Sequence, residues 1–212
     1  MKLYHGTSIR HLDSILEHGI QPRGSKKSVW SNAPSRKDMV YLTVAYPLHF
    51  ALSAASNEDR LIFEINIHRL NPWSLHPDED FLMQATRNQR PEGCPKDYRL
   101  ATKWFRQRLH DYARHWGASV EGLGNCCHLG MVPVSALTRY AIIPKEWPVL
   151  LWSDPMIMIA NYAVMSSYYC KLNATLFGDP VEPLTEADIF MKRGLPTVGD
   201  MEGIEVFSVP HK

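Results

Sequence analysis

The 212-residue sequence lacks any apolar run long enough to cross a bilayer, and no apolar signal-peptide segment follows Lys2. It has only four cysteines, and the adjacent pair Cys126-Cys127 does not match the C-x-x-C spacing of zinc ligands. Internal repeats and low-complexity tracts are also missing. These absences argue against a membrane protein, a disulfide framework and a zinc module. We therefore expect a cytoplasmic protein with reduced thiols and no bound metal.

The remaining composition is that of a folded protein. Hydrophobic residues make up 45% of the chain, which is enough to fill a core. Trp147-Pro148 marks a boundary, and residues 149–177 after it have an aromatic- and methionine-rich helical pattern. We expect one domain over residues 1–147 and a helical or irregular appendage over residues 148–212.

Hydrophobic periodicity predicts both strands and helices in this chain. Strand patterns occur at residues 3–7, 40–43, 61–67, 140–143 and 204–209. Residues 97–116 have the spacing of one amphipathic helix that ends at Gly117, and a short strand is expected at Ser119-Val120. Residues 70–81 are punctuated by prolines and predict a turn region.

Two short segments combine a strand pattern with polar residues suited to binding. Leu3-Tyr4-His5-Gly6-Thr7 places His5 next to a glycine whose backbone a ligand can approach closely. A helix pattern follows at once, with Ser8 or Thr7 as its cap and Gly19 at its end. The second segment, Val40-Tyr41-Leu42-Thr43, presents Tyr41 between aliphatic neighbours.

Together these segments resemble the ADP-ribosyltransferase superfamily, which includes PARPs, diphtheria-type toxins, rifampin ADP-ribosyltransferases and tRNA 2′-phosphotransferases. In that family a Tyr-His-Gly-Thr strand precedes a helix ending in glycine, and a second strand carries a tyrosine. The resemblance spans about residues 1–145, although its specific part is about ten residues. It implies an α+β fold with a split, mainly antiparallel β core of the ADP-ribosyltransferase type, flanking helices and a helical C-terminal appendage.

The resemblance also implies a reaction, the transfer of ADP-ribose from NAD to DNA, RNA or a protein. Cleavage of the nicotinamide–ribose bond develops positive charge on the ribose, so such an enzyme positions NAD and stabilises that charge. By position, His5 would bind the adenosine-side ribose, the Gly6 backbone would hold the nicotinamide amide, and Tyr41 would stack on the nicotinamide ring. Thr7 and Thr43 would support these contacts. The resemblance also suggests a toxin or a factor in phage–host conflict.

The glutamate that this family carries near its last core strand has no direct counterpart here. The matching stretch, Asn125-Cys126-Cys127-His128, contains no carboxylate. Glu121 is the nearest carboxylate, and His128 and Asn125 are alternative groups, Asn125 also as a contact to NAD. Glu64 is interpreted as an ordinary strand carboxylate. A missing glutamate fits altered transfer chemistry, as in the tRNA 2′-phosphotransferases, or an inactive protein.

Two other functions fit the same sequence. One is an inactive transferase fold that binds a nucleotide, a nucleic acid or a protein partner. The other is a nucleic-acid-binding module, since residues 86–116 hold eight basic and three acidic side chains, a local net charge of +5. Its contacts would be Arg99, Lys103, Arg106 and Arg108. A solvated helix face has the same composition, and residues 151–212 are acidic, with a net charge of −4.

Overall fold

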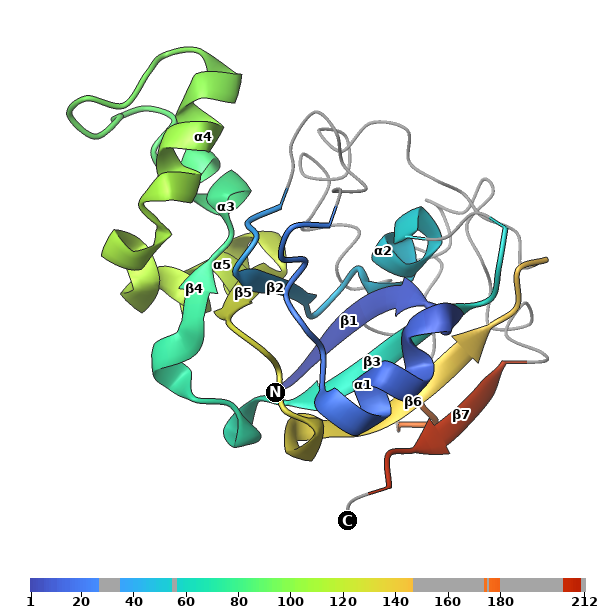
Figure 1. The fold of residues 1–212 in the computed structure, drawn as a ribbon. Coiled ribbons are helices and arrows are strands. Elements are labelled where there is room, and N and C mark those ends of the chain that lie inside the picture. The colour runs from blue at the N-terminus through green and yellow to red at the C-terminus, as the bar shows by residue number, and fades with distance from the viewer. Residues whose placement is uncertain (27–34, 55–56, 147–173, 175, 180–203, 211–212) are drawn as a thin grey trace, which may run out of the picture.

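The computed structural model describes residues 1–26, 35–54, 57–146, 174, 176–179 and 204–210 (Figure 1). Within them seven strands form one sheet in the order β4-β5-β2-β1-β3-β6-β7, with antiparallel pairing throughout. The strands are β1 (Lys2–Ser8), β2 (Met39–Thr43), β3 (Arg60–Asn66), β4 (Leu75–Pro77), β5 (Asn125–Leu129), β6 (Leu137–Ile143) and β7 (Glu205–Ser208). The expected α+β class is confirmed.

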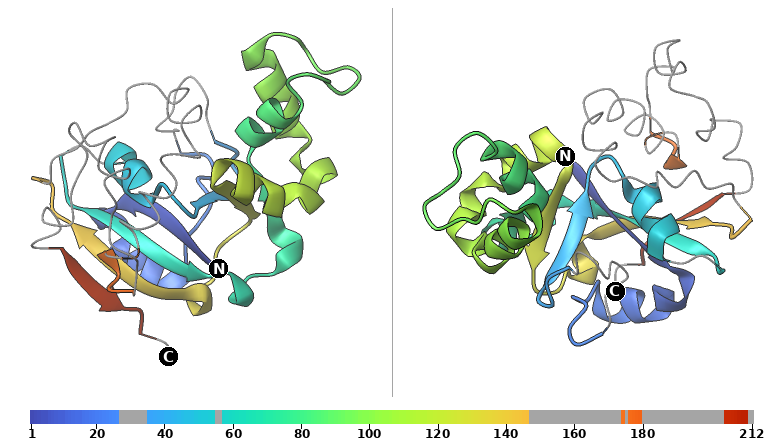
Figure 2. Two further views of the ribbon diagram at one scale, coloured as in Figure 1. Left: turned by 180° about the vertical axis from the view of Figure 1, so that it is seen from behind. Right: turned by 90° about the horizontal axis from the view of Figure 1, so that it is seen from above.

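Among the described residues, five helices cover the sheet in two groups (Figures 1 and 2). They are α1 (Leu12–His18), α2 (Pro47–Ala54), α3 (Glu79–Ala85), α4 (Tyr98–Gln107) and α5 (Trp116–Leu123). α1 and α2 lie on opposite faces of β1 and β3, whereas α3, α4 and α5 gather at the β4–β5 end of the sheet. In the described ranges no helix is both long and apolar enough to cross a membrane.

The sheet has two parts that meet at a single pair of residues. β1 and β3 pair along seven positions, but β1 and β2 pair only between Tyr4 and Thr43. Strand twist accumulates across a sheet, and two strands joined at one position are free to diverge beyond it. The β4-β5-β2 part and the β1-β3-β6-β7 part therefore separate next to His5, at the N-terminal end of the chain.

Two hydrophobic clusters pack on the sheet, and the larger one contains residues from both parts of it. The larger cluster packs α1 against β1 and β3 through residues such as Ile15, Leu3 and Phe63. The second cluster fills the space between β2, β5, α3 and α4, and it includes Met39, Leu82, Phe105, Leu109 and Cys127. Cys126 belongs to the first cluster and Cys127 to the second, since successive strand residues face opposite sides. Both side chains are fully buried, and burial raises the pKa of both thiols.

Several local predictions hold. The Ser8 hydroxyl accepts a hydrogen bond from the Arg10 N–H at 3.3 Å, and Gly19 ends α1 with a left-handed φ of 76°. The strand patterns at residues 61–67, 140–143 and 204–209 correspond to β3, β6 and β7. β7 comes from the expected C-terminal appendage and pairs with β6, whereas the helical pattern at residues 149–177 lies almost wholly outside the described residues.

The single helix predicted over residues 97–116 is wrong. Arg108 leaves helical geometry, with φ −118° and ψ 16°, and its N–H bonds a carbonyl three residues back at 2.8 Å. A 3-10 turn, Leu109–His115, follows and packs on β4, and Gly117 then lies inside α5. The apolar spacing alone does not distinguish one long helix from two helices joined by such a turn.

Two further predictions are corrected at the β4–β5 end. Residues 70–81, predicted as a turn region, contain β4 and the start of α3, and Ser119-Val120, predicted as a strand, lie in α5. The buried Ser119 hydroxyl donates to the Asn125 carbonyl at 2.7 Å and accepts from the Asp78 N–H at 2.9 Å. α5 is thereby joined to both β5 and α3, contacts between distant residues that a local pattern does not reveal.

Gly6 is required by packing between β1 and α2. A Cβ at this position would lie 2.3 Å from the Ala51 nitrogen and 2.4 Å from the Pro47 carbonyl oxygen, both backbone atoms of α2. Backbone atoms of a packed helix have little freedom to move away. The close approach expected of Gly6 is therefore made by a helix of the same chain.

We expect Gly6→Ala to lower the free energy of unfolding by about 1–3 kcal/mol, because overpacking forces α2 away from the sheet. Gly117→Ala is the matched control, since a Cβ there meets nothing within 4 Å and the residue lies in a helix. Urea unfolding of both variants measures the difference. Equal stability of the two variants would contradict the packing role of Gly6.

Candidate functional site

His5 bridges the two parts of the sheet where β1 and β2 separate. Its Nδ1 donates to the Tyr41 carbonyl oxygen at 3.0 Å, so an imidazole stands where a strand ladder would otherwise continue. Burial lowers the pKa of His5, although the bond to the carbonyl acts in the opposite direction. The neutral ring therefore donates from Nδ1 and keeps Nε2 as an acceptor.

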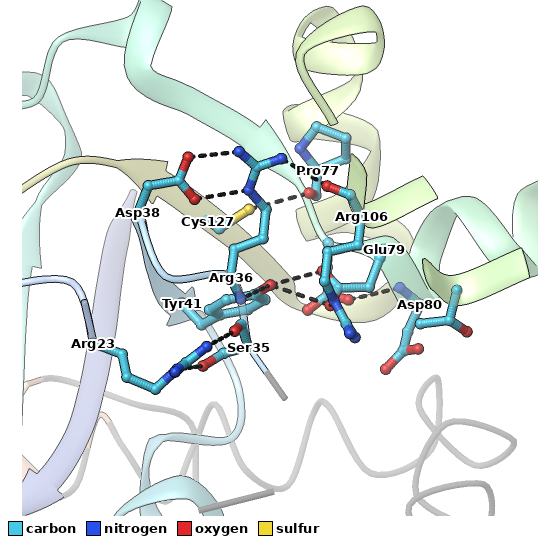
Figure 3. A network of polar contacts seen from close by, with 12 residues as sticks. Arg23, Ser35, Arg36, Asp38, Tyr41, Pro77, Glu79, Asp80, Arg106 and Cys127 are labelled. Carbon is cyan, nitrogen blue, oxygen red and sulfur yellow. Dashed lines mark hydrogen bonds and ion pairs between the residues drawn. The ribbon is translucent and has the colours of Figure 1, made fainter. Parts of the chain in front are cut away.

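Tyr41 directs its hydroxyl away from His5 and toward a carboxylate. Strand alternation places His5 on the face of Leu3, in the α1 core, whereas the Tyr41 ring packs in the second core with Cys127. The Tyr41 hydroxyl donates to the Glu79 carboxylate, with 2.9 Å to Oε2 and 3.1 Å to Oε1 (Figure 3). Burial, together with the Glu79 charge, raises the pKa of Tyr41 well above its usual range, so the hydroxyl keeps its proton.

Glu79 joins three segments of the chain around Tyr41. It lies in the first turn of α3, and its Oε1 also accepts from Arg106 Nε of α4 at 2.8 Å. The Glu79 and Arg106 side chains are 6% and 16% exposed, so this ion pair is shielded from water. Arg36, in the loop before β2, donates its backbone N–H to the Tyr41 hydroxyl and its Nη1 to the Arg106 carbonyl. Loop, strand and both helices thus form one polar network (Figure 3).

Two more carboxylates flank Glu79. The Asp78 side chain caps α3 by accepting the Asp80 N–H at 2.8 Å, and Tyr98 donates its hydroxyl to Asp80. Burial raises the pKa of Asp78, and the charges of Asp80 and Glu79 raise it further. The pKa of Asp80 is raised in the same way, by burial and by Glu79. The start of α3 is therefore a strongly acidic environment next to Tyr41.

The predicted catalytic residues on and before β5 do not join this network. Glu121 is exposed on α5, while His128 is buried and donates from Nδ1 to the Gly130 carbonyl at 3.3 Å. Thr43 stabilises the turn after β2, since its hydroxyl donates to the Gly124 carbonyl at 2.9 Å and accepts two backbone N–H groups. Thr7 is half-buried at the end of β1, where it pairs with Leu61.

Asn125 has a different position. It pairs with Thr43 across β2 and β5, two positions from the Tyr41–Cys127 pair, and so lies on the same face as Tyr41. Its Oδ1 is buried and has no hydrogen-bond partner within the part of the chain that the structure describes. Buried amide oxygens are normally paired, so this oxygen is an unused acceptor on the face of Tyr41.

The four predicted nucleic-acid contacts do not act as one set. Arg99 and Lys103 are exposed on α4. Arg106 is held by Glu79, and the Arg108 guanidinium lies over the Trp104 ring at 4.4 Å from its centroid. Two of the four side chains are thus engaged inside the protein.

Sequence reasoning missed Glu79, Arg106 and Arg36 as a group. The signal for Glu79 was present, since Asp78 followed by acidic residues and an apolar run is typical of a helix N-terminus. Arg106 was considered only as a contact for nucleic acid, and its pairing with a residue 27 positions earlier has no local signature. Across the described residues, no group of three or more His, Cys, Asp and Glu side chains is arranged to hold a metal ion.

Comparisons with known proteins add little to this geometry. No protein-family model matches the chain, and neither does any curated protein. A solved structure named EcPltA is similar over 66% of this chain and 74% of its own, with 11% sequence identity and a TM-score of 0.34.

Removing the Glu79 charge should destabilise the protein, because Arg106 would remain shielded without a counter-charge. We expect Glu79→Gln to lower the free energy of unfolding by about 3 kcal/mol. Glu58→Gln is the control, since Glu58 pairs with Arg10 at 3.7 Å and both side chains are more exposed, 33% and 63%. That variant should lose less than about 1 kcal/mol. Similar losses in urea unfolding would contradict the shielding of Glu79.

Neutralising Asp78 should have the opposite effect. Because its pKa is raised in the folded protein, ionisation opposes folding above the unfolded pKa, and this penalty is absent at lower pH. We expect Asp78→Asn to be more stable than the unmodified protein at pH 7, since asparagine also caps a helix. The gain should vanish near pH 3. Thermal unfolding between pH 3 and pH 7 tests this, and a gain that persists at pH 3 would be inconsistent with a charge effect.

Proposed function

We propose that the protein transfers ADP-ribose from NAD to a macromolecular acceptor. The contact between the Tyr41 hydroxyl and the Glu79 carboxylate carries this proposal. The resemblance implies a glutamate near the last core strand, and β5 contains no carboxylate, while the Glu121 side chain is exposed on α5. Glu79 is that carboxylate in our proposal, in place of Glu121 and His128.

The proposed reaction breaks the bond between nicotinamide and the ribose C1′. Nicotinamide leaves with the electron pair, and an acceptor nucleophile bonds to C1′ and gives its proton to water. Tyr41 offers its ring to nicotinamide, and Glu79 places negative charge near the ribose that becomes positive. Arg106 and the Tyr41 hydroxyl fix the orientation of that carboxylate, which is needed because stabilisation depends on preorganised charge.

The unpaired, buried oxygen of Asn125 is an argument for a ligand on the face of the sheet that carries Tyr41. It lies beside Thr43 on the face of Tyr41, and a carboxamide N–H such as that of nicotinamide is a suitable donor for it. His5 contacts the same strand from the other face, through the Tyr41 carbonyl. In the proposal His5 sets the position of Tyr41 and offers Nε2 to a ribose hydroxyl.

The acceptor class is suggested by the exposed face of α4. Arg99 and Lys103 are exposed on the helix that also carries Arg106. Positive side chains beside a site favour phosphate groups, so nucleic acid is the acceptor that we test first, with protein as the second arm.

The test is nicotinamide release from NAD by the purified protein, alone and with DNA, RNA or a cell lysate. We expect Glu79→Gln and Tyr41→Ala to reduce release about 100-fold or more, the usual effect of losing a preorganised electrostatic group. His5→Ala should reduce it strongly as well. Glu121→Gln is the matched control, because this exposed carboxylate should not affect the rate.

Circular dichroism must show that each variant is folded at the assay temperature. Tyr41→Phe keeps the aromatic ring and removes only the hydroxyl contact to Glu79. Full activity in folded Glu79→Gln would overturn the assignment of the carboxylate. NAD binding without nicotinamide release under every condition would instead favour the inactive transferase fold.

A further inference from the structure

A C-terminal segment, residues 176–179, is held against the β1-β3-β6-β7 part of the sheet by the aromatic ring of Phe177. Phe177 is 4% exposed and stacks on Tyr4 of β1, with ring centroids 5.5 Å apart and planes at 26°. The Arg139 guanidinium of β6 also contacts this ring, at 5.1 Å from its centroid. Stacking on tyrosine and on a guanidinium are contacts that proteins use to bind flat aromatic ligands.

The same segment places a carboxylate beside two cations. Asp179 accepts from Lys2 Nζ at 2.7 Å and from Arg139 Nη2 at 3.0 Å, and the Phe177 carbonyl accepts from Arg139 Nη1. Gly178 between them has a left-handed φ of 66°, which allows the tight turn that brings ring and carboxylate to the same surface. Ring, carbonyl and anion are thus recognised by three side chains of the sheet.

The charges beneath the segment balance only while it is in place. Glu64 is 3% exposed and contacts Lys2 Nζ at 3.0 Å, and it also accepts from Thr138 and Arg139. Burial alone would raise the pKa of Glu64, but the bonds from Arg139, Thr138 and Lys2 outweigh it, so the pKa is lowered. Without Asp179, two cations would share one carboxylate, and the surplus positive charge would favour an anion.

Space for a ligand lies next to these residues. A hollow of about 510 Å³ is lined by Lys2, Tyr4 and Asp179, among others, and another of about 220 Å³ by Lys2, Glu64 and Thr138. The first hollow is wide and largely open to solvent. Lys2 lines both hollows, so displacement of residues 176–179 would leave open space around its ammonium group.

We propose that Lys2, Tyr4 and Arg139 form a second ligand site, for a molecule of the nucleoside-monophosphate class, which residues 176–179 occupy as an internal competitor. Tyr4 and Arg139 take the base in place of Phe177, and Lys2 and Arg139 take the phosphate in place of Asp179. The site shares no residue with Tyr41, Glu79 or Asn125, and it stands whether or not the protein consumes NAD.

The test uses AMP as the probe and isothermal titration calorimetry on the full chain. We expect the double variant Phe177→Ala/Asp179→Asn to bind AMP at least about tenfold more tightly than the unmodified protein, because an occupied site lowers apparent affinity. Adenosine and ribose 5-phosphate, which each carry half of the recognised chemistry, should bind more weakly than AMP. Phe207→Ala is the matched control, since Phe207 stacks on Tyr140 elsewhere in the sheet.

Further substitutions in the double variant locate the site. Lys2→Gln and Arg139→Gln should each weaken AMP binding about tenfold or more, while Tyr41→Ala should leave it unchanged. AMP binding that Tyr41→Ala removes, and Lys2→Gln does not, would assign the nucleotide to the Tyr41 face and overturn the second site. No AMP binding by the folded double variant, or equal binding of ribose 5-phosphate and AMP, would overturn it too. Asp179→Asn alone, which preserves packing, should bind AMP more tightly than the unmodified protein.

Discussion

The hydrogen bond between the Tyr41 hydroxyl and the Glu79 carboxylate is the interaction on which this end of the molecule depends. It connects β2 to the first turn of α3, and the same carboxylate holds Arg106 of α4. Arg36 adds the loop before β2 to the group. The apolar cluster beneath would hold α3 and α4 near the sheet without specifying their angle, whereas a shielded hydrogen bond and ion pair have strict geometry. The polar network thus fixes the orientation of α3 and α4, which apolar packing alone does not determine.

The first strand is constrained from three directions. β3 pairs with it along seven positions, α2 packs directly on Gly6, and the His5 imidazole bonds the Tyr41 carbonyl beyond the last pair with β2. A histidine followed by a glycine is therefore explained by the fold as well as by ligand binding. α2 requires the glycine because it packs on it, and the histidine bonds a carbonyl of β2, so neither residue needs a ligand to account for it. This dual use makes a strand motif weaker support for function than a contact such as Tyr41–Glu79.

Local sequence patterns predicted the features that depend on residues close in sequence, but not the contacts between residues far apart in the chain. The period-two strands, the Ser8 cap of the 3-10 helix Ile9–His11 and the end of α1 at Gly19 were predictable, because alternation and capping act over a few residues. The break at Arg108 was not, since the apolar spacing continues through the 3-10 turn. Glu121, His128 and Asn125 were considered because they lie on or near β5 in sequence, yet the carboxylate that bonds the Tyr41 hydroxyl is 38 positions from Tyr41. Only the return of the chain through β4, within a stretch punctuated by prolines, brings Glu79 there.

Two glutamates that are buried in the described part of the chain, Glu64 and Glu79, have different surroundings and therefore different roles. Glu64 lies between two cations, Lys2 and Arg139, so its charge is compensated and it serves to hold positive groups in place. Glu79 has one cation, Arg106, and two acidic neighbours whose pKa values are raised. The first environment attracts an anion once Asp179 is absent, and the second repels anions and favours a developing cation. In the proposed reaction the ribose therefore belongs beside Glu79, and the phosphates of NAD must point away from α3.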